Sequence, residues 1–247
     1  MTGAEDTRPP APVPGPRVRR RQARIAQILA AAEHVFAEAG FAGASMSALA
    51  AAAGLPKANL HYYFGTKEAL YTTLLDNILA LWLSATDGIH PEAEPAEALS
   101  AYVRAKMRWS RERPQASRVF ANEVLHGAPY LRSQLAGPLR ALVREKSAVL
   151  EGWIAAGRMA PVDPPHLFFS IWAMTQTYAD FGAQIGAVLD LPEPDAPCFA
   201  RGTETILQLV LRGCGLEPGG PPWRADPPER HPAFRQAPCP GKRSNSS

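Results

Sequence analysis

The chain has 247 residues, of which 46% are hydrophobic, which is enough for one large domain or two small ones with a sizeable core. Its net charge of +3 is unevenly spread: residues 1–67 carry 8 Lys/Arg against 4 Asp/Glu, whereas residues 68–216 carry 13 against 16. A basic front end on a slightly acidic body is typical of a protein that meets phosphates at one end only, and it argues against a protein that coats nucleic acid through a broad positive surface.

The first segment, residues 1–21, is rich in proline and ends in a run of arginines. Such a segment cannot bury apolar surface, so we expect it to be disordered. Its arginines make it a candidate arm that touches DNA phosphates. A solvated tail with no such contact is the alternative.

Three short helices are predicted next. Residues 21–39 place apolar side chains at a spacing of three to four, and Gly40 follows as a helix stop. Ser45 is the expected N-cap of a second, alanine-rich helix. Gly54 permits a left-handed turn before a third helix over residues 56–64. Two short helices around a tight turn, the second basic and aromatic, are typical of a helix-turn-helix that places its second helix in a DNA major groove.

The third helix supplies most of the candidate contacts to DNA. Lys57 can donate to guanine, and Ala58 can lie beside a thymine methyl group. Tyrosine hydroxyls and a lysine ammonium suit phosphate oxygens, and a helix N-terminus at Ser45 suits another phosphate. For Tyr63 a packing role is equally compatible with the pattern. The candidate DNA-binding residues are Ser45, Lys57, Ala58, Asn59, His61, Tyr62, Tyr63 and Lys67.

The rest of the chain is also predicted to be helical. Thr66 is the expected cap of a fourth helix that carries a long apolar face and contains Trp82. No strand pattern and no internal repeat is evident, and the residues from 217 onward have the composition of a disordered tail. Further helices are expected over residues 96–113, 115–126, 139–156, 165–189 and 199–212.

Within the predicted helix over residues 165–189, Trp172 and Gln176 lie four residues apart and therefore share one face. An indole offers a flat surface for a planar base, and a glutamine amide matches the adjacent N–H and C=O groups of a uracil edge. From spacing alone, a packing role for the two tryptophans and a backbone hydrogen bond for Gln176 remain the simpler interpretation.

One run of motifs is specific: Gly40-Phe41, Ser45-Met46, Gly54-Leu55-Pro56-Lys57, Tyr62-Tyr63-Phe64 and Lys67-Glu68-Ala69-Leu70. Through it, the segment from Arg24 to Leu70 resembles the DNA-binding domain of TetR-family transcriptional regulators. The resemblance implies an all-α fold, with a three-helix helix-turn-helix head at residues 22–67 and a helical ligand-binding and dimerisation body at residues 68–216. It also implies a homodimer that binds a palindromic double-stranded DNA operator, with no catalytic residue and no cofactor.

The body carries a narrower resemblance. Residues 110–118, 127–129 and 171–181 are similar to the pyrimidine-utilisation regulators of that family. This implies a small planar ligand such as uracil or thymine, whose binding releases DNA, and it places Trp82, Trp172, Gln176 and Tyr178 among the candidate ligand-binding residues. The alternative is a TetR-type repressor that senses an unrelated drug, lipid or metabolite.

Other functional classes are disfavoured. Cys198, Cys214 and Cys239 form no CxxC pair, and no cluster has metal-ligand or catalytic-triad spacing, so we expect neither a metal site nor an enzyme. No apolar run reaches the roughly 18–20 residues that span a bilayer. No apolar segment follows the N-terminal arginines, so a cytoplasmic protein is expected.

Overall fold

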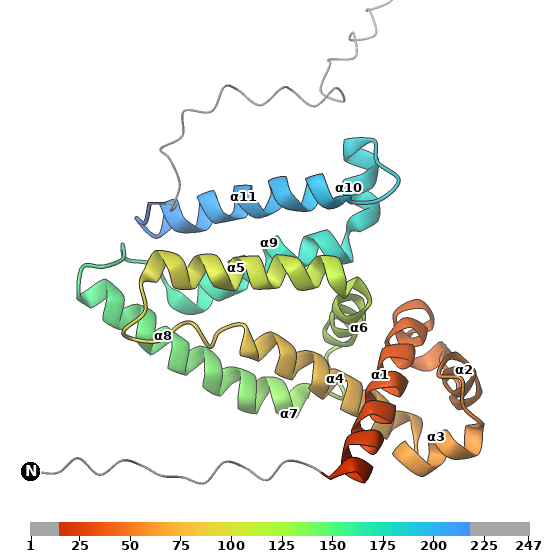
Figure 1. Cartoon of the computed structure of the whole chain (residues 1–247). Helices are drawn as coiled ribbons and strands as arrows, with labels where there is room; N and C mark the ends of the chain where they lie inside the picture. Colours follow the sequence, from red (N-terminus) through yellow and green to blue (C-terminus); the bar gives the residue numbers. More distant parts are fainter. Residues whose placement is uncertain (1–14, 218–247) are drawn as a thin grey trace, which may run out of the picture. The chain divides into compact units, whose positions relative to one another are not determined.

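The computed structural model describes residues 15–217. Residues 1–14 of the expected arm and residues 218–247 of the expected tail, with Cys239, lie outside the described residues. Every regular element within residues 15–217 is a helix, which confirms the all-α fold (Figure 1). The helices form two compact units, each with its own core.

The first unit contains the described chain up to Leu81 together with Gln115–Gly137. It is therefore larger than the three-helix head expected to end at residue 67. Its helices are α1 (Pro16–Gly43), α2 (Met46–Ala52), α3 (Lys57–Phe64), most of α4 (Lys67–Ser84), α6 (Pro114–Leu125) and α7 (Arg132–Gln134). Its core consists of side chains that are almost completely buried, among them Ile28, Phe36, Leu49, Leu60, Leu70 and Leu74.

Helix α1 begins earlier than expected. Residues 16–21 were assigned to the disordered arm, but they form the first turns of α1. Pro16 occupies a first-turn position, where a missing N–H costs nothing, and the arginines that follow are good helix formers. Arg17, Arg19 and Arg20 are exposed, so this extension depends on helix propensity and not on burial. At Gly40 the backbone leaves the helical region (φ 65°), as expected of a helix stop, and one short turn follows.

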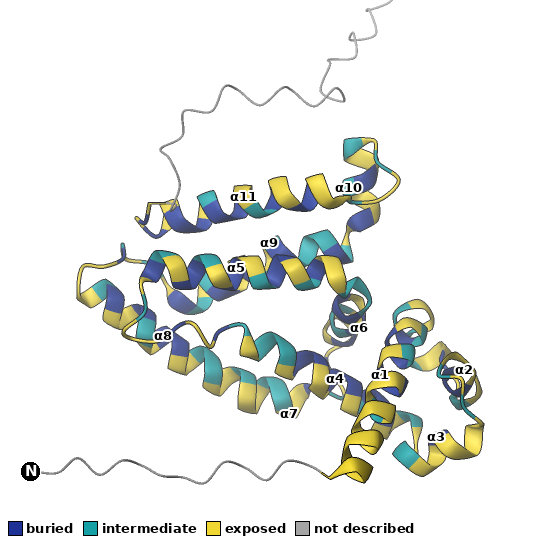
Figure 2. Cartoon of the chain, viewed as in Figure 1, coloured by how far each residue is buried: buried dark blue, intermediate teal, exposed yellow. Residues whose placement is uncertain are grey.

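The second unit contains Trp82–Pro114 and the described chain from Pro138 onward. Its helices are α5 (Pro95–Glu112), α8 (Arg140–Ala155), α9 (Pro164–Asp180), α10 (Gly182–Leu189) and α11 (Ala196–Gly213); a π-helical turn, η1 (Leu135–Leu139), precedes α8. Helices α5, α9 and α11 pack side by side (Figure 1). Their facing sides are buried, whereas their outer sides are exposed (Figure 2).

The single helix expected over residues 165–189 is in fact two. Helix α9 ends at Phe181, whose φ of −113° and ψ of 31° leave the helical region, and α10 starts at Gly182. The apolar spacing continues through Ile185 and Leu189, so the sequence pattern gave no sign of the break. Gly182 has low helix propensity and is buried against Pro194 in the chain that follows α10, which makes it the point where the helix changes direction.

Candidate functional site

Helix α3 presents a continuous exposed surface. Lys57, Ala58, Asn59 and His61 are exposed, whereas Leu60 is fully buried and fixes the helix to the core of its unit. An exposed surface that combines an ammonium, an amide and an imidazole can make hydrogen bonds to base edges in a major groove. The structure thus brings together four of the residues predicted to contact DNA.

The two tyrosines of α3 differ in exposure. Tyr62 is 80% exposed, a large value for an aromatic side chain, and Tyr63 is half-buried. Their rings contact each other edge to face, with centroids 5.4 Å apart. His61 is held as well, because its Nδ1 lies 2.7 Å from the carbonyl oxygen of Gly65. The exposed side of α3 therefore carries oriented aromatic groups.

The turn before α3 has the geometry that its sequence predicts. The Ser45 Oγ accepts a hydrogen bond from the Ala48 N–H at 3.1 Å, which confirms Ser45 as the N-cap of α2. Gly54 adopts a φ of 63°, a left-handed conformation that a residue with a side chain rarely adopts. The cap of α2 and the turn at Gly54 therefore have the local geometry expected of a helix-turn-helix.

Lys67 has a different environment from the exposed residues of α3. Its Nζ donates hydrogen bonds to the carbonyl oxygens of Phe41, at 2.8 Å, and Ala44, at 2.9 Å. The ammonium also lies 4.3 Å from the centroid of the Phe41 ring. Lys67 therefore connects the start of α4 to the turn that follows Gly40. Its predicted contact with a DNA phosphate stays a prediction.

An aromatic cluster extends from this point within the same unit. The Phe41 ring lies 4.9 Å from Tyr71 and 4.7 Å from Tyr130, between centroids. Glu123 of α6 accepts a hydrogen bond from the Tyr130 N–H at 2.6 Å. Burial, together with the neighbouring Glu123 carboxyl, raises the pKa of Tyr71 well above its ordinary value. No local sequence pattern predicted this cluster, which joins α6 to the end of α1.

In the second unit, two hydrogen bonds join α5 to α9. The Trp172 indole N–H donates to the Tyr102 hydroxyl at 2.6 Å, and the Ser110 hydroxyl donates to the Thr175 carbonyl at 2.8 Å. Burial raises the pKa of Tyr102 to about 12, so its hydroxyl stays neutral. The hydroxyl oxygen accepts the hydrogen bond from the indole N–H. Trp172 is therefore oriented by α5.

Between these two hydrogen bonds lies Lys106, a residue that the sequence analysis did not select. Its side chain is only 4% exposed, and its Nζ lies 4.2 Å from the centroid of the Trp82 ring. Burial lowers the pKa of Lys106 to about 8, and the charge of Asp180 partly opposes this shift. The sequence did contain a signal: Tyr102, Lys106 and Ser110 repeat every four residues on a helix side that is otherwise apolar.

Gln176 lies one turn beyond Trp172 on the same side of α9 and is half-buried. Within residues 15–217 its side-chain amide forms no hydrogen bond. The structure thus places Trp82 of α4 against Lys106 of α5, and Trp172 of α9 against Tyr102, which lies one turn before Lys106 on α5. These four residues and Gln176 are called here the α5–α9 site.

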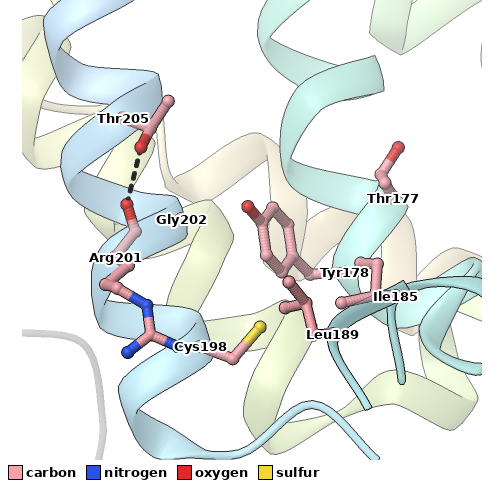
Figure 3. Close-up of a pocket in the computed structure, with 8 residues that line it drawn as sticks. All are labelled: Thr177, Tyr178, Ile185, Leu189, Cys198, Arg201, Gly202 and Thr205. Carbon is pink, nitrogen blue, oxygen red and sulfur yellow. Dashed lines mark hydrogen bonds between the residues drawn. The ribbon is translucent and has the colours of Figure 1, made fainter. Parts of the chain in front are cut away.

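Tyr178 is not part of the α5–α9 site. It lines a separate hollow of about 210 Å³ between α9, α10 and α11 (Figure 3). Its ring contacts Phe199 of α11, with centroids 5.6 Å apart, and its hydroxyl lies directly against Gly202. The other residues of the hollow are Thr177, Ile185, Leu189, Cys198, Arg201 and Thr205.

Family models match nearly the whole described chain. Residues 28–74 match the model of bacterial regulatory proteins of the tetR family, and residues 75–217 match the model of the C-terminal region of YcdC-like proteins. The chain belongs to the TetR family. Its matched halves meet inside α4, which begins in the first unit and ends in the second.

Relatives with assigned names also indicate a transcriptional regulator. This TetR-family chain is 43% identical to the HTH-type transcriptional regulator RutR of Escherichia coli over 199 residues, which cover 81% of this chain and 94% of RutR. It is 28% identical to the HTH-type transcriptional repressor NicS of Pseudomonas putida, over 75% of this chain and 90% of NicS. These relatives are transcriptional regulators and not enzymes. As a member of the same family, this chain is a transcriptional regulator and not an enzyme.

A solved structure confirms the fold. The structure of AibR in complex with isovaleryl coenzyme A and operator DNA aligns with a TM-score of 0.59 at 21% identity, over 79% of this chain and 98% of AibR. Among residues 15–217, no group of three or more His, Cys, Asp or Glu side chains is placed to hold a metal ion. In the same range, no helix is both long and apolar enough to cross a bilayer.

Proposed function

We propose that this ligand-responsive TetR-family regulator senses a pyrimidine such as uracil or thymine and releases its operator when the pyrimidine binds. The observation that carries the proposal is the unengaged amide of Gln176 one turn from the oriented indole of Trp172. The indole offers a stacking surface, and the amide offers one acceptor and two donors in a plane. The resemblance to pyrimidine-utilisation regulators and the 43% identity to RutR support the same ligand class.

DNA recognition is assigned to α3. Lys57, Ala58, Asn59 and His61 face the bases in this proposal, and Tyr62 and Tyr63 contact the phosphate backbone. Ser45 and Lys67 add phosphate contacts at the ends of α2 and α4. In a homodimer on a palindromic operator, the two α3 helices lie about 34–36 Å apart, one turn of DNA.

Helix α4 is the proposed connection between ligand and DNA. It begins at Lys67, beside the end of α3, and it reaches Trp82, whose ring lies against Lys106. A ligand that contacts Trp82 can therefore change the position of α4. It shifts the protein away from DNA only to the extent that it binds the DNA-free conformation more tightly.

The ligand claim is tested by isothermal titration of the purified protein with uracil and with thymine. Heat that saturates at one ligand per protomer is expected, and no heat with either ligand at high protein concentration would contradict the claim. A binding site selected from random duplexes, then measured by fluorescence anisotropy, should be released by the same ligand.

The Gln176→Leu variant separates a pyrimidine sensor from a sensor of hydrophobic ligands. Loss of ligand response with operator binding intact supports the pyrimidine. A sensor of an apolar molecule should tolerate the leucine. Gln184→Leu, on the exposed side of α10, is the matched control and should leave both activities unchanged.

A further inference from the structure

Within residues 15–217, the buried ammonium of Lys106 donates no hydrogen bond. Its Nζ lies 4.2 Å from the centroid of the Trp82 ring, and the charge of Asp180 acts on it. Burial of a charged group is costly unless the group is paired and hydrogen-bonded. A ring face compensates only part of that cost.

Lys146 shows how the same fold satisfies a buried lysine. It is 8% exposed, and its Nζ donates to the carbonyl oxygen of Ile89 at 3.1 Å and lies 2.9 Å from a carboxylate oxygen of Glu145. Both lysines lie in the second unit and are buried to a similar extent. The difference is that Lys146 has oxygen partners and Lys106 keeps its donors unused.

The unused donors of Lys106 lie in a defined place. On α5, Lys106 is one turn after Tyr102, which holds Trp172, and one turn before Ser110, which holds the backbone of Thr175. On α9, Gln176 follows Trp172 by one turn and directly follows Thr175, so it lies next to one of these two hydrogen bonds. The ammonium and the amide therefore come from the same stretches of α5 and α9, where the two hydrogen bonds join these helices.

We infer that Lys106 recognises an exocyclic carbonyl oxygen of the ligand and makes the α5–α9 site prefer rings with two carbonyl groups over rings in which an amino group replaces one. This inference rests on the proposed function. A lysine ammonium only donates hydrogen bonds, so it attracts a carbonyl oxygen and leaves an amino group facing another donor. A glutamine amide can turn over to suit either partner, which is why selectivity is assigned to Lys106 and not to Gln176.

The test is isothermal titration of the full chain with uracil and with cytosine, which differ by this one group. The wild-type protein is expected to bind uracil at least tenfold more tightly than cytosine, because a site with a buried donor rejects the unmatched analogue strongly. In Lys106→Met, affinity for uracil should fall about tenfold or more while affinity for cytosine changes little, so the ratio collapses. Lys146→Met is the matched control and should retain the ratio.

Lys106→Gln is a second variant that tests the same role of Lys106 if Lys106→Met does not fold. Its side chain can accept as well as donate, so it should move the preference toward cytosine. Operator binding by each variant, measured without ligand, reports that the protein is folded. If the wild type binds uracil and both Lys106 variants keep its selectivity, the role of Lys106 is wrong and the pyrimidine proposal survives. If the wild type binds neither ring, both proposals are wrong.

Discussion

The ammonium of Lys67 donates to the carbonyl oxygen of Phe41, 26 residues earlier in the chain, and so fixes the start of α4 to the end of α1. A second bond to Ala44 strengthens this connection. We therefore expect Lys67→Met to lower the free energy of unfolding by about 1–3 kcal/mol, because two part-buried carbonyl groups lose their donor. Urea unfolding followed by circular dichroism measures this change, and unchanged stability would contradict it.

Lys57 is the comparison, because it is exposed and its proposed role is in DNA binding alone. Because it is exposed, Lys57→Ala should leave the unfolding free energy within about 0.5 kcal/mol of the wild type. If it donates to a base edge, the loss should weaken operator binding by about 1–3 kcal/mol and relax the preference at one base pair. Anisotropy titrations with operator variants check both effects. Equal losses on all duplexes would show a phosphate contact instead.

Lys106 is expected to be a residue that costs stability. Its pKa of about 8 lies below the ordinary 10.5, so the unfolded chain binds this proton more tightly than the folded chain does. The cost is therefore present in full below pH 8 and disappears as the pH rises from 8 to 10.5. Lys106→Met should raise the unfolding free energy at pH 7 by up to about 3 kcal/mol, and this gain should shrink by pH 10.

Two other groups bear on that pH dependence. Asp180 on α9 opposes the shift of Lys106, and Tyr102 on α5, with a pKa of about 12, stays neutral over this range. Urea titrations of wild type and Lys106→Met at pH 7 and pH 10 give the comparison. A difference between the two proteins that does not change with pH would show that the ammonium is not the cause.

The hydrogen bond between Trp172 and Tyr102 is expected to fix the orientation of the indole. Tyr102→Phe removes the acceptor and leaves an indole N–H without a partner, which should cost about 1–3 kcal/mol of stability and weaken ligand binding. Tyr178→Phe is the control, because within residues 15–217 the Tyr178 hydroxyl makes no hydrogen bond. Tryptophan fluorescence should change in the first variant and not in the second.

The contact between Gly202 and Tyr178 sets how closely α11 approaches α9. A Cβ at position 202 would overlap the Tyr178 hydroxyl oxygen and would lie 2.6 Å from a carbon of the ring, so Gly202→Ala should destabilise the second unit by about 1–3 kcal/mol. Adding Tyr178→Ala should restore part of that loss. Gly213→Ala, at the end of the same helix with open space around it, should have no such effect. The midpoints of thermal unfolding of the wild type, the two single glycine variants and the double variant test these expectations.

Local signals accounted for most of the fold. The cap at Ser45 and the left-handed turn at Gly54 depend on chemistry within a few residues, and the structure confirms both. The early start of α1 and the break at Phe181 were missed because apolar spacing marks neither of them. At Gly182 the chain folds back toward Pro194, a contact that no window of sequence contains.

In the α5–α9 site, too, the contacts between residues far apart in the sequence could not be predicted from local patterns. Spacing placed Trp172 and Gln176 on one face of a helix, but it was the resemblance to pyrimidine-utilisation regulators that made them candidate ligand-binding residues. Their partners could not be predicted: the Tyr102 hydroxyl is 70 residues away from the Trp172 indole, and Lys106 meets Trp82 from another helix. Tyr178 was grouped with them through the same resemblance, and the structure places it in the hollow beside α11.

The hydrogen bond between the His61 ring and the Gly65 carbonyl has a consequence for the base that His61 is proposed to contact. Since a carbonyl oxygen only accepts, the proton of the neutral imidazole must be on Nδ1, and Nε2 is then an acceptor. In that tautomer the Nε2 of the ring suits the amino groups of adenine or cytosine. The proposed contact of His61 would therefore favour a base pair that presents an amino group in the major groove at that position.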